Sequence, residues 1–211
     1  REDPAEETER GPEGEPEKSP EAEERLSAAE KRARQKQATD RGTACHRMLE
    51  LIHFSDISGY EDVKKEFARD LSEKRMQPDA VRLVSPGMIA KFFRSGIAGR
   101  MKMADRQGKL RKESQFILGI PAREMKAADS DELVLIQGII DAWFEEKDGL
   151  VIVDYKTDRV KEGEEQTLLD HYQVQLQYYA RALSQITGKR VKEAVIYSLT
   201  IQKEINVPIG Q

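Results

Sequence analysis

The pattern of apolar and polar positions is clearest between Gln137 and Asp158, where two apolar runs flank the turn-forming pair Asp148-Gly149. A pair of this kind between apolar runs is the strongest short-range sign of two antiparallel strands joined by a tight turn. The stretch therefore predicts a β-hairpin, with a two-residue loop at either Lys147-Asp148 or Asp148-Gly149.

The predicted hairpin gathers charged side chains on one face. Side chains two apart on a strand point the same way, so Asp154 and Lys156 share a face. With either two-residue loop Asp141 falls on that face too, directly opposite Asp154 in the first register and diagonal to it in the second. Like charges across neighbouring strands repel, and directly opposed Cβ atoms lie roughly 5 Å apart. Because one divalent cation with oxygen ligands could bridge that span, the pattern favours a metal site over a solvated hairpin.

Helical and strand periodicities predict the elements on either side of the hairpin. Thr39 or Asp40 can cap one helix, and Ser85 followed by Pro86 marks the start of another. Residues 21–37 suit an exposed helix or an extension of a linker. The predicted helices cover residues 38–53, 60–76, 86–94, 97–105 and 168–186, and the further strands cover residues 111–120 and 193–201.

The helix predicted over residues 168–186 has a core stripe that includes Tyr172, Tyr179 and Ile186. Gln175 shares a face with Tyr179 because the two are four residues apart. A buried glutamine needs a hydrogen-bond partner, so both side chains could reach toward the carboxylates of the hairpin. Gly188 is expected to end the helix.

Composition separates an acidic beginning from a mildly basic body. Residues 1–25 contain 11 acidic and 4 basic residues and are rich in Glu, Pro and Gly, which predicts a flexible tail or linker. Residues 26–211, with 28 acidic and 31 basic residues, form the predicted single domain. Residues 91–112 are a basic stretch that suits a phosphate contact surface about as well as a solvated helix face. This balance is compatible with nucleic acid as a partner.

Several other classes of protein are disfavoured. The chain has no run of about eighteen apolar residues and starts with charged residues, so we expect neither a membrane span nor a signal peptide. A single cysteine excludes an internal disulfide framework and a four-cysteine metal site, and suits a cytoplasmic protein. Adjacent helix residues diverge by about 100°, so Cys45 beside His46 is interpreted as a packing residue. A lone histidine on a helix is more often structural than a ligand, and the pattern alone gives His46 no role.

Four segments in order resemble the RecB-type nuclease domain of the PD-(D/E)XK superfamily. They are Gly42-Thr-Ala-x-His46, Gln137-Gly-Ile-Ile-Asp141, Val153-Asp-Tyr-Lys-Thr-Asp158 and Gln175-x-x-x-Tyr179-Ala-x-Ala-Leu183. The closest likeness is to the C-terminal nuclease domain of AddA-type helicase-nuclease subunits, and it covers roughly residues 39–199. It implies an α/β fold of the restriction-endonuclease-like type, with a central mixed β-sheet flanked by helices.

The resemblance also implies a metal-binding and catalytic set. His46, Asp141, Asp154 and the backbone carbonyl of Tyr155 match the family's metal ligands, and Lys156 matches its catalytic lysine. The implied catalytic residues are therefore Asp141, Asp154 and Lys156. The implied metal is Mg²⁺, and a histidine ligand also admits Mn²⁺.

Gln175 and Tyr179 match a motif that supports the site and the DNA in this family. The resemblance implies hydrolysis of DNA phosphodiester bonds, by the exonuclease domain of a helicase-nuclease that processes double-strand breaks for recombinational repair. The implied partners are single- or double-stranded DNA ends, a helicase region and a partner subunit, with no membrane. The chain has no G-x-x-x-x-G-K-[ST] phosphate loop, so it contains no recognisable ATPase motor.

Two alternatives stay open. The same fold could serve as a non-catalytic module that binds DNA ends or a partner protein, although intact Asp141, Asp154 and Lys156 argue against it. It could also belong to a free-standing phage or mobile-element nuclease with the same site.

Overall fold

The computed structural model describes residues 27–124 and 130–209 of the 211-residue chain. The chain divides into two units at the junction of Gln37 and Ala38, and the fold described below is that of the second unit. The acidic tail predicted over residues 1–25 lies outside the described residues and stays a prediction. Within the described ranges, no helix is both long enough and apolar enough to cross a membrane.

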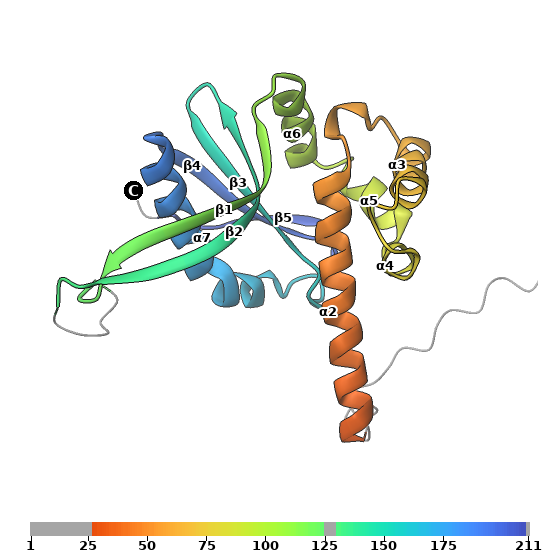
Figure 1. The fold of residues 1–211 in the computed structure, drawn as a ribbon, viewed down its shortest axis with the longest axis horizontal. Coiled ribbons are helices and arrows are strands. Elements are labelled where there is room, and N and C mark those ends of the chain that lie inside the picture. Colours follow the sequence, from red (N-terminus) through yellow and green to blue (C-terminus); the bar gives the residue numbers. More distant parts are fainter. Residues whose placement is uncertain (1–26, 125–129, 210–211) are drawn as a thin grey trace, which may run out of the picture. The chain divides into compact units, whose positions relative to one another are not determined.

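A five-stranded mixed sheet lies at the centre of the fold, in the order β1-β2-β3-β4-β5 (Figure 1). Its strands are β1 (Leu110–Pro121), β2 (Leu133–Glu146), β3 (Gly149–Lys156), β4 (Val191–Ser198) and β5 (Lys203–Asn206). Neighbouring strands are antiparallel except β3 and β4, which are parallel and are connected through helix α7 (Glu165–Thr187). The predicted α/β architecture with a mixed sheet is confirmed.

Helices cover both faces of the sheet (Figure 1). Along β3, Val151, Val153 and Tyr155 enter a first core with the earlier helices, while Leu150 and Ile152 enter a second core with α7. Burial on both faces explains why β3 reads as one continuous apolar run. The earlier helices are α2 (Ala28–Leu51), the 3-10 helix η1 (Phe54–Asp56), α3 (Tyr60–Ser72), α4 (Pro78–Arg82), α5 (Pro86–Phe92) and α6 (Gly96–Arg106).

The turn of the central hairpin follows the first of the two predicted registers. Glu146 pairs with Gly149, so the loop is Lys147-Asp148. The φ of Gly149 is 151°, a conformation that side chains rarely adopt. The ladder between β2 and β3 continues to the pair of Ala142 and Val153, so Asp141 and Asp154 come one step beyond its last pair.

Some helix boundaries follow the sequence and others do not. The Ser85 hydroxyl accepts a hydrogen bond from Met88 N at the start of α5, and Gly188 ends α7 with a φ of 67°, both as predicted. The expected cap at Thr39 or Asp40 is wrong, because α2 runs through both without interruption. The Ala-, Lys-, Arg- and Gln-rich sequence before them has high helix propensity, which outweighs the capping tendency of two short polar side chains.

Other expectations also need correction. Ile186, predicted in the core stripe of α7, is 62% exposed because the stripe leaves the core near the end of the helix. Strand β5 and helix α4 were not predicted, and each is only four or five residues long. Elements this short carry too few periodic positions to be recognised from sequence.

Two members of the predicted basic stretch are structural. Lys112 Nζ donates to Ile52 O at 2.7 Å and lies close to Leu49 O, which satisfies carbonyls at the end of α2. Burial lowers the pKa of Lys112. Arg100 makes bidentate pairs with Glu146 and Glu193, with donor-acceptor distances between 2.7 and 3.1 Å, and so ties α6 to the sheet.

Replacing Glu146 by Gln is expected to lower the free energy of unfolding at pH 7 by about 1 to 2 kcal/mol, because a bidentate charge-assisted pair is lost. Hydrogen bonding to Arg100 lowers the pKa of Glu146 from 4.5 to about 2. A depressed carboxyl pKa adds stability above pH 4.5, and this is lost as the pH falls toward 2. The variant should therefore lose less stability than the wild type across that window, as urea unfolding at several pH values would measure. The exposed Glu132→Gln variant is the control, and parallel curves for Glu146→Gln and the wild type would contradict the prediction.

The hairpin of β1 and β2 changes the core that it faces partway along its length. Leu110 and Phe144, near the β2-β3 turn, lie in the first core. Phe116 and Ile140, further along the same two strands, lie in the second core. All four are even-numbered, so an uninterrupted pleat would have placed them on one face.

The change of face occurs at Glu113. Its φ is 48°, in the left-handed region that non-glycine residues seldom occupy. The ladder passes directly from the pair Lys112-Ala142 to the pair Ser114-Ile140 and leaves out Glu113 and Asp141, which would oppose each other. Glu113 and Asp141 are therefore the two residues at this point of the sheet that take no part in the regular pairing of β1 with β2.

Candidate metal centre

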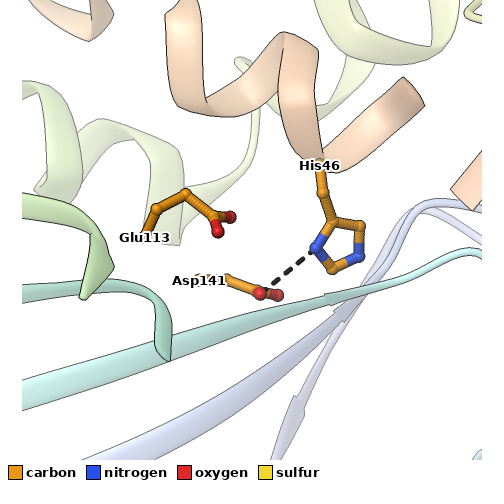
Figure 2. Close-up of side chains that lie close together, drawn as sticks. All are labelled: His46, Glu113 and Asp141. Carbon is orange, nitrogen blue, oxygen red and sulfur yellow. Dashed lines mark hydrogen bonds and ion pairs between the residues drawn. The ribbon is translucent and has the colours of Figure 1, made fainter. Parts of the chain in front are cut away.

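Three side chains from three elements meet beside this break in the ladder. His46 comes from α2, Glu113 from β1 and Asp141 from β2, and Figure 2 shows them pointing toward one another. One potential ligand atom from each lies within 4.8 Å of the others. His46 Nδ1 is 3.1 Å from Asp141 Oδ1. All three line a cavity of about 450 Å³ that Gly42 and Glu50 also border.

Close packing of α2 on the end of β3 brings His46 to the sheet. A Cβ atom added to Gly42 would lie 3.1 Å from Thr157 Oγ1, so α2 and the residue after β3 approach closely at this glycine and a larger side chain would require Thr157 to shift. Arg41 Nη2 donates to Thr157 O at 3.0 Å and fixes the same approach. His46, one helical turn after Gly42, then faces Asp141. The expected proximity of His46 and Asp141 is thus present in the structure, and its use as a ligand is taken up below as a proposal.

Asp141 connects the cluster to β3. Its Oδ2 accepts a hydrogen bond from Tyr155 N at 2.8 Å, while Oδ1 contacts His46. The side chain replaces the main-chain acceptor that a continued ladder would have offered to Tyr155. Asp141 therefore lies next to the backbone that carries Asp154.

Asp154 and Lys156 form a buried ion pair on the face of β3 that α7 covers. Asp154 is 2% exposed, and its Oδ2 is 2.5 Å from Lys156 Nζ. The two side chains share a face, as the period of two predicts. Burial, followed by the negative charge of Asp141, raises the pKa of Asp154. A carboxylate so placed is stabilised by added positive charge.

The neighbouring acids also shift the pKa values of Glu113 and His46. Burial and then the charge of Asp141 raise the pKa of Glu113. Burial alone would lower the pKa of His46, but its bond to Asp141 and the charges of Asp141 and Asp154 outweigh that effect, so the pKa is raised. The site is electrostatically suited to a cation.

The donor set fits a hard divalent cation. An imidazole nitrogen and converging carboxylate oxygens are ligands that Mg²⁺ and Mn²⁺ accept. His46 and Asp141 belong to the set implied by the resemblance and also to the cluster in the structure. Glu113 belongs only to the cluster, whereas Asp154 and the Tyr155 carbonyl belong only to the implied set.

Glu113 is the site residue that the sequence reasoning missed. The sequence placed it near the start of a predicted strand, without a role. Its position opposite Asp141 depends on the register across the connection between β1 and β2, which no turn signal fixes. An acidic residue shortly before the apolar run of a strand was the only available hint.

Gln175 and Tyr179 lie together on α7 over the second core. Gln175 Nε2 donates to Tyr179 OH at 2.8 Å, and the Tyr179 ring meets Phe116 edge to face at 5.4 Å between centroids. A Cβ atom on Gly138 would lie 2.8 Å from the Phe116 ring, so the glycine is needed for this packing. Within the described residues, Gln175 Oε1 is buried without a hydrogen-bond partner. The pair braces β1 and β2 next to the cluster.

Cys45 has no place in the site. It is fully buried in the first core, and burial raises the pKa of its thiol to about 11. A thiol that stays protonated is a poor nucleophile. The interpretation of Cys45 as a packing residue is confirmed.

A mixed sheet covered by helices on both faces, with acids gathered where its strands part, defines the restriction-endonuclease-like class of fold. The chain belongs to the PD-(D/E)XK nuclease superfamily, a family of phosphodiesterases, whose profile matches residues 21–208. The resemblance drawn from the four sequence segments is therefore confirmed at the level of the family.

Curated relatives are similar across most of this chain. It is 35% identical over 212 residues to an ATP-dependent helicase/nuclease subunit from Lachnoclostridium phytofermentans, covering 84% of this chain and 15% of that protein. It is 34% identical over 173 residues to the protein of the same name from Clostridium novyi, covering 80% and 14%. The chain thus spans only a small part of the length of these relatives. A solved structure, that of SSO0001, is similar with a TM-score of 0.36 and 17% identity, covering 74% of this chain and 68% of the other.

Proposed function

We propose that this chain is a metal-dependent DNA nuclease, the exonuclease domain of a helicase-nuclease that processes double-strand breaks for recombinational repair. The observation that carries the proposal is the convergence of His46, Glu113 and Asp141 within 4.8 Å of one another, in a chain of a nuclease family. Asp154 and Lys156 adjoin this cluster through the hydrogen bond between Asp141 and Tyr155 N.

In this proposal His46 and Asp141 hold Mg²⁺ or Mn²⁺. The remaining ligands are Asp154 and the Tyr155 carbonyl, as the resemblance implies, or Glu113, which the geometry favours. A bound divalent cation supplies Lewis-acid activation of water and of the scissile phosphate.

The protein side chains supply orientation and charge. Lys156 donates hydrogen bonds to the attacking water or to a phosphate oxygen, and its positive charge offsets the negative charge that grows on the phosphate. Asp154 holds the ammonium group of Lys156 in place, at 2.5 Å. Gln175 and Tyr179 support the strands that carry the acids.

The substrate in this proposal is a single- or double-stranded DNA end, held mainly through its phosphates, so base specificity is low. Exposed cations on α5 and α6, such as Lys91 and Arg106, are candidates for those contacts. A helicase region and a partner subunit in the intact protein are supported by the names of the relatives. A cytoplasmic location accords with this role.

The proposal is tested with purified protein and end-labelled linear DNA, single- and double-stranded, in Mg²⁺, Mn²⁺ or EDTA. We expect cleavage from the ends in either metal and none in EDTA, with covalently closed circles resistant. Full activity in EDTA would overturn the metal requirement. Cleavage of closed circles as fast as of linear DNA would overturn the exonuclease assignment. Tight binding of ends without cleavage in any metal would instead favour a non-catalytic module.

A further inference from the structure

The ammonium group of Lys156 has a second neighbour besides Asp154. Lys156 Nζ lies 4.1 Å from the centroid of the Tyr172 ring, well within the range of a cation-π interaction. Tyr172 comes from the first half of α7 and lies outside the four segments that carry the family resemblance. The sequence predicts only a core role for it, through its place on an apolar stripe.

Tyr172 is itself held in place by the segment that directly follows β3. Its hydroxyl donates to Asp158 Oδ1 at 2.9 Å, and burial, followed by that hydrogen bond, raises the pKa of Tyr172 to about 12. The phenol therefore remains a donor at neutral pH. The Tyr172 ring thus contacts Lys156, the last residue of β3, and the Tyr172 hydroxyl contacts Asp158, two residues further along the chain.

A lysine needs such a constraint to act reliably. Its four-carbon stem is flexible, and an ammonium group has no preferred direction of its own. The Asp154 carboxylate contacts Nζ of Lys156 from within β3, and the face of the Tyr172 ring adds a second contact from α7. A cation is attracted to the face of a partly desolvated aromatic ring, so the Tyr172 ring favours the arrangement of the stem that places Nζ over it.

We propose that Tyr172 is a positioning residue for Lys156: its ring face holds the ammonium group toward the site, and Asp158 holds the ring through the phenol hydroxyl. The inference rests on the proposed nuclease function and adds to it a residue with no contact to the reacting atoms. Packing is the competing role, because Tyr172 is also partly buried against the second core.

Kinetics separate these two roles. Tyr172→Leu is expected to lower kcat on linear DNA about 5- to 30-fold, with the KM for DNA and the affinity for Mn²⁺ changed by less than about 3-fold, because neither a ligand nor a DNA contact is lost. Tyr172→Phe, which keeps the ring, should stay within about 5-fold of the wild type. Tyr178→Leu, on the same helix and also partly buried, is the matched control and should change kcat less than 2-fold.

A double-mutant cycle sharpens the test. In a Lys156→Met background, Tyr172→Leu should cause no further loss, because the group that it positions is gone. An equal loss in both backgrounds would overturn the proposal in favour of packing. If Tyr172→Phe and Tyr172→Leu lowered kcat to a similar extent, the proposal that the aromatic ring positions Lys156 would be overturned.

A spectroscopic measurement tests the arrangement without activity. The ε-methylene signal of Lys156, assigned by its loss in Lys156→Met, should be shifted upfield by the ring current in the wild type and in Tyr172→Phe. It should return to the position of an ordinary lysine in Tyr172→Leu. An unshifted wild-type signal would overturn the contact. A protein that shows the shift but cleaves no DNA would refute the nuclease function and leave the contact standing.

Discussion

Asp141→Asn should reduce DNA cleavage in Mg²⁺ at least a hundredfold while leaving the fold intact. Asp141 is the carboxylate common to both proposed ligand sets, and loss of one strong electrostatic contact at a reacting centre costs about 10²- to 10³-fold in rate. Asparagine has the same shape, and its amide can still accept from Tyr155 N and donate to His46 Nδ1. Single-turnover cleavage of linear DNA measures the loss.

Stability provides the second half of this prediction. Asp141 raises the pKa of both Glu113 and Asp154, so removal of its charge relieves repulsion in the metal-free protein. The melting temperature of Asp141→Asn without metal should therefore equal or exceed that of the wild type, the exchange of stability for function common at active sites. Asp170→Asn, an exposed acid on α7, is the control for both measurements. Wild-type cleavage by Asp141→Asn would remove Asp141 from the proposed machinery.

Phe92→Ala should lower the free energy of unfolding by about 3 to 5 kcal/mol, the usual cost of emptying a large buried aromatic site. Phe92 is fully buried, and its ring meets those of Tyr155 and Tyr197 at centroid distances of 5.5 and 4.8 Å. It also meets Phe54 and Phe93, so one side chain joins η1 and α5 to the two central parallel strands. For a domain of this size the melting temperature should fall on the order of 10 °C.

Chemical denaturation of Phe92→Ala and of Met103→Ala separates the effect of the cavity from that of lost surface. Met103 is 61% exposed on α6, so its truncation should change stability by less than about 0.5 kcal/mol. A loss below about 1 kcal/mol for Phe92→Ala would mean that the first core collapses around the vacated space. That result would contradict the interpretation that Phe92 is the main side chain packing α5 against β3 and β4.

Local signals predicted much of the fold because they act over short distances. The turn signal at Asp148-Gly149, the Ser85 cap and the Gly188 helix end depend on a few neighbouring residues. The structure has its two-residue turn at Lys147-Asp148, directly before Gly149, and Ser85 and Gly188 act as predicted. The central hairpin followed from its turn. Asp154 and Lys156 share a face because the period of two holds along the whole of β3.

The break at Glu113 escaped prediction because it depends on tertiary packing. Alternation assumes an uninterrupted pleat, but a left-handed residue in β1 exchanges its two faces. Tyr172 was missed for a related reason. An amphipathic stripe shows that a side chain points inward, but not that a lysine from another element will lie against its ring.

His46 and Asp141 are 95 residues apart along the chain, and this separation determines when during synthesis the proposed nuclease site can form. Joining segments so far apart carries a loop-closure cost that only the packing of α2 on the finished sheet offsets. During synthesis α2 emerges from the ribosome well before β2 and β3, so a nascent chain presents its histidine without the acids that complete the site. If the proposed site is the nuclease site, unfinished chains and fragments that end between α6 and β2 lack Asp141 and are expected to cleave no DNA.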